Sequence, residues 1–196
     1  MGPVYPERPR RERPIAYGRP VTDSPAAPAP HTHCSSCGAR HRADAGWPRT
    51  CPSCGTTAYR NPLPVAIALL PVTTGTGSTA LVVITRTIPP AAGQVALPGG
   101  FIDFGEDWQH AVARELYEET GIPATADEVR LADALSSPAG HLLVLGLLPP
   151  RPADTLPPPA PTDETTGHHL LHGPEELAFP LHTEAVRRFF SGAYDR

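Results

Sequence analysis

Residues 100–122 read GFIDFGEDWQHAVARELYEETGI, and this stretch decides the fold of the chain. Five residues separate its first glycine from a glutamate, and seven more lead to an Arg-Glu pair that precedes a second pair of glutamates. At about 100° per residue, a helix places Glu115, Glu118 and Glu119 on one face. Like charges at this spacing repel one another, so such a helix needs a compensating cation.

Two interpretations of this acidic face are open. A solvated helix surface would explain Glu118 and Glu119 taken alone. A divalent metal site would explain the whole stretch, because carboxylate oxygens suit Mg²⁺ and Mn²⁺, which bind through a few carboxylates together with substrate phosphates. The neighbouring residues favour the metal site: Arg114 lies one turn before Glu118 and can orient it. Gly121 is expected to end the helix, and residues 97–101 allow a tight backbone turn beside a phosphate.

The pattern resembles, position for position, the Nudix box of pyrophosphohydrolases. The resemblance implies a Nudix fold and a hydrolase of acid anhydrides that cleaves a diphosphate. It also implies the roles of the box residues. The ligands of one or more Mg²⁺ or Mn²⁺ ions would be Glu115, Glu118, Glu119 and the Gly100 carbonyl. Gly99 and Gly100 would face the diphosphate, while Arg114 and Glu106 would support the ligands from behind.

All four cysteines occur in two Cys-x-x-Cys pairs, Cys34 with Cys37 and Cys51 with Cys54. A glycine follows each pair and tolerates the positive φ that a zinc knuckle requires. Two knuckles would make a closed Cys₄ site for structural Zn²⁺. A disulfide pair or a redox motif is the weaker interpretation, because cytosolic proteins rarely keep disulfides and a redox motif needs a single pair. Three nearby histidines could replace a thiolate, but four thiolates complete the shell; they are His31, His33 and His41.

The 196 residues suit one full domain with a small accessory module. The 27 prolines concentrate before residue 30 and at 149–161, which predicts a disordered Pro/Arg-rich arm over residues 1–30 and a later Pro-rich loop. We expect a zinc ribbon at 31–60, with zinc supplying its folding free energy. The catalytic domain is expected at 61–192.

Apolar runs of strand length follow the ribbon and alternate with two amphipathic helices. Strands are expected at 64–70, 80–85, 94–97, 129–135, 141–148 and 168–172, and helices at 107–120 and 183–191. The first two strands should form a hairpin around a turn at 75–78. The fold class is therefore α/β, an α/β/α sandwich with a mixed sheet, as the Nudix resemblance also implies. Five histidines are interpreted as surface or strand-pairing residues, namely His141, His168, His169, His172 and His182.

The formal net charge of −4 argues against nucleic acid as a partner. The basic run at 8–13 is either a solvated tail or a weak contact for a polyanion. An apolar run long enough for a membrane span and a signal-peptide pattern are both missing, so we expect no membrane association and a cytoplasmic location. Zinc ribbons also serve as dimerisation elements, so a homodimer is one option.

Ribbon, box and final helix together resemble the zinc-ribbon Nudix hydrolases, which include NADH, ADP-ribose and FAD pyrophosphatases. The resemblance implies a nucleotide-diphosphate substrate split by water into a nucleoside monophosphate. The general base would be a box glutamate or one of Asp163 and Glu164, which could equally be an exposed loop pair. The Ser-Gln-Pro-Trp-Pro-Phe-Pro element of NADH pyrophosphatases is replaced by SSPAG at 136–140.

Two other functions stay open. Some Nudix domains sense nucleotides as regulators without hydrolysis, but these usually have lost box carboxylates, whereas this box is intact. A second alternative is the removal of a 5′ nucleotide cap from RNA, with ribbon and arm gripping the strand. The net negative charge counts against that alternative.

Overall fold

The computed structural model describes residues 31–75 and 77–195. The chain divides between Arg60 and Asn61 into two compact units, each described by itself below. The expected disordered arm at 1–30 lies outside the described residues. Within the described ranges, no helix combines the length and the apolar composition that crossing a membrane requires.

The first unit is built on two similar turns and one short hairpin. Strands β1 (Arg49–Thr50) and β2 (Thr57–Ala58) pair antiparallel. In each turn the glycine that follows a cysteine pair donates its N–H to the carbonyl of the pair's first cysteine at 2.9 Å. Gly38 and Gly55 both have φ of 74°, the left-handed conformation expected of a knuckle.

The second unit contains nine strands, two α-helices and two short 3₁₀ turns among its described residues. The strands are β3 (Leu63–Leu69), β4 (Pro71–Thr73), β5 (Thr79–Arg86), β6 (Val95–Ala96), β7 (Gly99–Phe101), β8 (Arg130–Ser136), β9 (His141–Leu147), β10 (Arg151–Pro152) and β11 (Thr165–Leu171). The helical segments are α1 (Trp108–Thr120), η1 (Ala126–Glu128), η2 (Ala153–Thr155) and α2 (Pro180–Phe190). One sheet has the order β7-β3-β9-β8, and the other has the order β10-β4-β5-β11 with β6 also paired to β5. Both are mixed, since β3 pairs parallel with β9 and β10 pairs parallel with β4.

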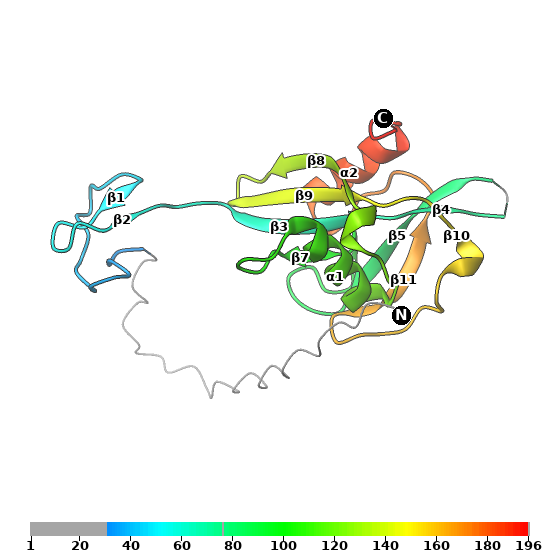
Figure 1. Ribbon diagram of the computed structural model, residues 1–196, viewed down its shortest axis with the longest axis horizontal. Coiled ribbons are helices and arrows are strands. Elements are labelled where there is room, and N and C mark those ends of the chain that lie inside the picture. The colour runs from blue at the N-terminus through cyan, green and yellow to red at the C-terminus, as the bar shows by residue number, and fades with distance from the viewer. Residues whose placement is uncertain (1–30, 76, 196) are drawn as a thin grey trace. The chain divides into compact units, whose positions relative to one another are not determined.

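Strand β3 is buried on both faces and connects two apolar cores. Ala66 and Ala68 belong to the core that includes α1, whereas Ile67 and Leu69 belong to the core that includes α2. On the neighbouring β9, a side chain at Gly146 would meet Val112 of α1, so α1 packs against small residues. The two helices therefore cover opposite faces of the central strands, and the predicted α/β/α sandwich is confirmed (Figure 1).

Two sequence-based expectations need correction. The hairpin is formed by β4 and β5 around the turn at 74–78, while β3 pairs with β7 and β9 in the other sheet. The chain passes from one sheet to the other after Leu69, so one apolar run became two strands. Helix α2 starts at Pro180 instead of residue 183, because proline is well tolerated in a first helical turn.

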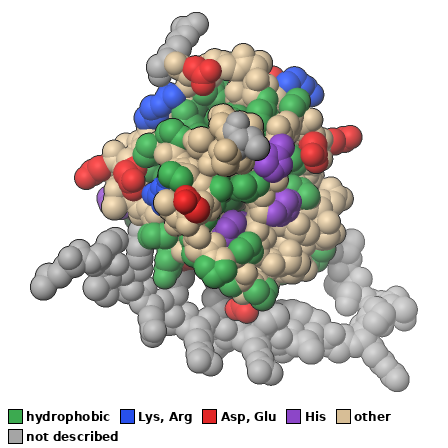
Figure 2. All heavy atoms as spheres, turned by 90° about the vertical axis from the view of Figure 1, so that its right-hand side faces the viewer, with side chains coloured by type: hydrophobic (Ala, Val, Ile, Leu, Met, Phe, Trp, Pro, Cys, Tyr) green, Lys and Arg blue, Asp and Glu red, His purple; other side chains and the backbone are tan. Residues whose placement is uncertain are grey.

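The surface of the second unit is mixed in charge. On the face that Figure 2 shows, the basic side chains of the described residues lie singly among acidic, histidine and apolar ones. This distribution agrees with the net charge of −4. It gives no continuous basic field on this face for a nucleic acid backbone.

Candidate active site

Helix α1 carries the box glutamates, and its ends are fixed as the sequence predicts. At the N-terminus, the Asp107 carboxylate accepts a hydrogen bond from the Gln109 N–H at 3.0 Å. At the C-terminus, Gly121 has φ of 72° and donates its N–H to the Tyr117 carbonyl. One face, which includes Val112 and Leu116, is buried in the core. The glutamates are therefore presented on a helix that cannot rotate.

The glycine loop, residues 97–101, which ends in strand β7, lies directly against this helix. The Gly99 N–H donates to Glu119 Oε2 at 2.9 Å. A side chain at Gly99 would lie 2.3 Å from the Ala66 carbonyl oxygen, and one at Gly100 would lie 2.6 Å from Glu115 Oε1. Position 99 therefore requires glycine, whereas a side chain at position 100 would have to displace the Glu115 carboxylate, which lies beside Gly100 as expected.

Arg114 connects the helix to the loop between the two halves of the box. Its Nε and Nη2 donate to the two oxygens of Glu106 at 2.7 and 2.8 Å, which is a bidentate pair. Its Nη1 also donates to Glu115 Oε1 at 2.5 Å and to Glu118 Oε2 at 3.2 Å. Hydrogen bonding to Glu106 raises the pKa of Arg114 above its ordinary value. The guanidinium thus sets the positions of two box carboxylates while staying charged.

The box carboxylates differ in exposure. Glu119 is only 4% exposed, and desolvation by burial raises the pKa of its carboxyl to about 8. Burial is also the main cause that raises the pKa of Glu115. Glu118 is more exposed, at 39% of its side chain. A desolvated carboxylate is stabilised by a nearby cation, so the donor set of carboxylates beside a backbone turn fits Mg²⁺ or Mn²⁺.

The ligand atoms of the box carboxylates are more widely spread than those of the cysteine group. Among the described residues, one group of three or more His, Cys, Asp or Glu has all its ligand atoms within 4.8 Å, and it is the cysteine group of the first unit. In the second unit, Arg114 holds Glu115 and Glu118, while the Gly99 N–H holds Glu119.

The loop before β11 brings Glu164 to the same site. Its negative charge raises the pKa of both Glu115 and Glu119. Its backbone is fixed, because the Thr87 N–H donates to the Glu164 carbonyl at 2.8 Å and the Glu164 N–H donates to Thr162 Oγ1 at 3.2 Å. The side chain is exposed. An exposed carboxylate on a fixed backbone beside the box can accept a proton from a bound water. The adjacent Asp163 is also exposed.

Sequence reasoning missed three side chains that connect helix α1, strand β11, helix α2 and the glycine loop. Thr165 Oγ1 donates to the Glu119 carbonyl at 3.0 Å, and His168 Nδ1 donates to the Thr120 carbonyl at 3.2 Å. His182 of α2 is buried and accepts a hydrogen bond from the Leu97 N–H at 3.2 Å, so it is neither a surface nor a strand-pairing residue. Each of these contacts joins residues at least 46 positions apart, and no local pattern signals them.

In the first unit, the four cysteines meet at metal-binding distance. Their sulfur atoms all lie within 4.8 Å of one another. The closest contacts are 3.7 Å between Cys34 and Cys54 and 3.6 Å between Cys37 and Cys51. All four are free thiols, so the contacts are not disulfides. The arrangement is that of a closed Cys₄ zinc site.

The thiols have unequal proton affinities. Backbone N–H groups of Cys37 and Ser36 lower the pKa of Cys34, and hydrogen bonds with the Thr56 side chain and backbone lower that of Cys54 to about 6. For Cys37 the Ala39 N–H lowers the pKa, but the thiols of Cys54 and Cys51 outweigh it and raise the pKa to about 12. Four thiolates at this distance need a cation between them.

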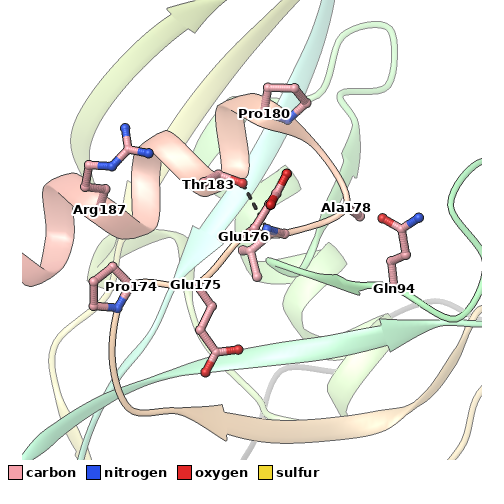
Figure 3. A pocket seen from close by; sticks show the side chains of 9 residues that line it. Gln94, Pro174, Glu175, Glu176, Ala178, Pro180, Thr183 and Arg187 are labelled. Atoms are coloured by element: carbon pink, nitrogen blue, oxygen red, sulfur yellow. Dashed lines mark hydrogen bonds between the residues drawn. The ribbon is translucent and has the colours of Figure 1, made fainter.

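A separate groove of about 850 Å³ lies beside the start of α2 (Figure 3). Its lining residues are Gln94, Pro174, Glu175, Glu176, Leu177, Ala178, Pro180, Thr183 and Arg187. The Glu175 and Glu176 side chains point in different directions in Figure 3. They do not converge on a common ligand position, and the lining contains no box residue.

The NUDIX domain family model matches residues 62–191, which is most of the chain and all of the box. The chain belongs to the NUDIX family. Two solved NUDIX structures share the fold: a hydrolase from Nitrosomonas europaea and a mutT/nudix protein from Listeria innocua. The first has a TM-score of 0.63 and 22% identity, covering 82% of this chain and 91% of that chain. The second has a TM-score of 0.54 and 21% identity, covering 69% of this chain and 96% of that chain.

Two curated relatives have described activities. A protein named NAD-capped RNA hydrolase NudC from Deinococcus radiodurans is 31% identical over 116 residues, which is 59% of this chain and 40% of that protein. An ADP-ribose pyrophosphatase from Methanocaldococcus jannaschii is 48% identical over 42 residues, which is 21% of this chain and 25% of that protein. This NUDIX chain thus spans less than half the length of these relatives.

Proposed function

We propose that the chain is a Mg²⁺- or Mn²⁺-dependent pyrophosphohydrolase. Its substrate would be a nucleoside diphosphate linked to another moiety, such as ADP-ribose, NADH or an FAD-like dinucleotide. The products would be a nucleoside monophosphate and the phosphorylated second moiety. We also propose that residues 31–60 form a zinc-dependent module and that residues 61–192 form the hydrolase domain.

One observation carries this proposal: the Glu115 carboxylate lies against Gly100 while the buried Glu119 accepts a hydrogen bond from Gly99. Two carboxylates on a fixed helix therefore adjoin two glycines whose backbone can approach a ligand closely. Carboxylate and carbonyl oxygens are suitable ligands for a hard divalent cation. The residues that would hold it are Glu115, Glu118, Glu119 and the Gly100 carbonyl.

The remaining residues would position the ligand carboxylates and activate the attacking water. A bound divalent cation would neutralise charge on the diphosphate and lower the pKa of a bound water. Arg114 and Glu106 keep the carboxylates in place through the bidentate pair, and Arg114 must move away from Glu118 if that side chain turns to a ligand. Glu164 would take the proton from the attacking water. All four cysteines lie in the metal cluster of the first unit, so no thiol is available beside the box as a nucleophile. Water would therefore attack the phosphorus directly.

A second candidate substrate is NAD-capped RNA. The observation that favours it is the 31% identity to the Deinococcus radiodurans protein of that name. The same diphosphate would be cleaved, but an RNA strand would extend from the nucleotide. The net charge of −4 disfavours a long contact with an RNA backbone, so the small-molecule substrate is the first choice.

The test is a hydrolysis panel in ¹⁸O-water with Mg²⁺ or Mn²⁺. ADP-ribose, NADH, FAD and NAD-capped RNA would be compared, with the Glu118→Gln variant as the control for background activity. We expect one substrate class to yield a nucleoside monophosphate, with a single label on phosphorus. Binding of every nucleotide without turnover would instead indicate a nucleotide-sensing regulator. A label on a ribose carbon would exclude attack of water on phosphorus.

A further inference from the structure

The glycine loop is held by three different elements at three consecutive residues. The Leu97 N–H donates to His182 of α2, and the Pro98 carbonyl accepts from the Ala68 N–H of β3 at 2.9 Å. The Gly99 N–H then donates to Glu119 of α1. Gly100 follows directly, and its carbonyl is the proposed metal ligand. Gly100 itself lies in β7 and pairs with Ala66 of β3, so the three anchors fix the segment that leads into this strand.

The anchor on α2 is well defined. Leu97 and His182 are 1% and 6% exposed, so water does not compete for their hydrogen bond. The His182 ring packs edge-on against Phe179, with 5.0 Å between ring centroids. The Arg86 guanidinium lies 5.4 Å from the centre of the Phe179 ring, so this ring contacts both a cation and the imidazole. The hydrogen bond and the ring contact together orient the imidazole toward Leu97.

The same stretch of chain makes a second bond to the strand before the loop. The Ala178 N–H donates to the Val95 carbonyl of β6 at 2.8 Å. Strand β6 is only two residues long, and it is otherwise paired to β5. The segment that leads into α2 therefore supports this strand on its free edge, just before the glycines.

The protonation state of His182 matches this arrangement. Its Nδ1 accepts the Leu97 N–H, so Nδ1 must be unprotonated and the proton must be on Nε2. Desolvation by burial and then the nearby Arg86 charge lower the pKa of His182 to about 4. The neighbours of the ring are therefore one cation, Arg86, and the apolar residues Leu97 and Phe179. The ring stays neutral at neutral pH.

We propose that His182 is a positioning residue, which holds the glycine loop in the place from which the Gly100 carbonyl reaches the metal. The metal-binding part of this inference rests on the proposed function. The positioning part concerns the protein alone. The last helix, which begins at Pro180, far along the chain from the end of the box at Ile122, would then set the geometry of the metal site.

The test compares two amide variants that differ in where they place an acceptor. In His182→Asn the side-chain oxygen takes the place of Nδ1, whereas in His182→Gln it takes the place of Nε2. Val186→Ala is the control, because Val186 is buried on the same helix and packs in the α2 core. The readouts are hydrogen exchange of the Leu97 amide and the amide signals of Gly99 and Gly100 in the metal-free protein. Mn²⁺ affinity from electron paramagnetic resonance is the third readout.

We expect His182→Gln to expose the Leu97 amide to exchange, shift both glycine signals and weaken Mn²⁺ binding about tenfold. His182→Asn should restore the parent values, and Val186→Ala should lower only the melting temperature. Parent-like glycine signals in His182→Gln would overturn the inference, as would equal shifts in Val186→Ala. If the parent binds no Mn²⁺, the proposed function loses its metal site, and the metal-free spectra still decide whether His182 positions the loop.

Discussion

Gly99 and Gly100 are adjacent, but different atoms exclude a side chain at each. A methyl group at Gly99 would meet the backbone oxygen of Ala66 on the central strand β3. At Gly100 it would meet the carboxylate of Glu115, which is the end of a longer side chain. A strand backbone cannot move without disturbing the sheet, whereas a carboxylate can rotate. Substitution should therefore affect folding at the first position and the metal site at the second.

Gly100→Ala should leave the fold intact and weaken Mn²⁺ binding about tenfold or more, because the methyl group displaces the Glu115 carboxylate. Gly173→Ala is the matched control, since a side chain there meets nothing within 4 Å. Thermal melting and a Mn²⁺ titration would measure the two effects. A Gly100→Ala protein with parent affinity would show that Glu115 is not a ligand in this position.

Glu119→Gln should reduce metal-dependent turnover about a hundredfold, because an amide keeps the shape of the side chain but not its charge. The amide oxygen can still accept the Gly99 N–H, and a desolvated carboxyl is removed, so stability should not fall. Steady-state kinetics and urea unfolding check both statements. Turnover close to that of the parent in metal-limited buffer would contradict the assigned site.

Hydrogen bonds connect helix α1 to strand β11, although the two elements are far apart in the sequence. The last carbonyls of a helix lack internal partners, and here Thr165 and His168 of β11 supply donors for two of them. Thr165 also follows Glu164 directly. The element that completes the helix is thus the element that delivers the proposed base.

Thr165→Val should destabilise the protein by about 1–3 kcal/mol, because the Glu119 carbonyl loses its hydrogen bond in a buried place. Thr166→Val is the control, since Thr166 is the next residue of the same strand and its side chain is exposed. Urea unfolding followed by circular dichroism gives both values. Equal midpoints for the two variants would argue against this contact.

Helix α2 should make stability depend on pH in the acid range. The native pKa of His182 is about 4, below the ordinary value of 6.5, so the unfolded chain binds the extra proton first. Stability is therefore full above pH 6.5 and falls as the pH drops toward 4, by about 3 kcal/mol at most. His182→Asn should lack this part of the loss. Unfolding curves from pH 4 to 7 for both proteins measure the difference.

The sequence predicts those parts of the fold whose signals are local. The spacing of the box gives helix α1 and its end at Gly121, and the two Cys-x-x-Cys pairs give the knuckles of the first unit. The crossing of the chain from one sheet to the other between β3 and β4 has no such signal, because the two strands form one continuous apolar run in the sequence. The contacts of His182 and Thr165 depend on how distant elements pack, so they follow only from the structure.

At the scale of the whole molecule, the two units differ in what holds them together. The second unit has two apolar cores, whereas the first has four thiols around one point and few buried side chains. A small unit of this kind depends on a metal for its folding free energy. The second unit has its two apolar cores for this purpose.

Metal analysis of the purified protein should give one zinc per chain, held by the four cysteines. Strong chelation should unfold the first unit, while the second keeps its cooperative melting transition. Mass spectrometry of the intact protein supplies the check. A zinc-free protein with two disulfides would refute the Cys₄ assignment.

Strand β3 is buried on both faces, so its register determines how both cores of the second unit pack. Ala66 and Ala68 are small and belong to the core that includes α1, while Ile67 and Leu69 are large and belong to the core that includes α2. Insertion of a single residue before Ala66 would exchange these sets, forcing Ile67 and Leu69 under the closely packed helix. It would also move the Ala68 amide away from Pro98 and the glycine loop. A change in a strand that carries no carboxylate would thus disable both cores and the site together, so natural length variation should be confined to the turns.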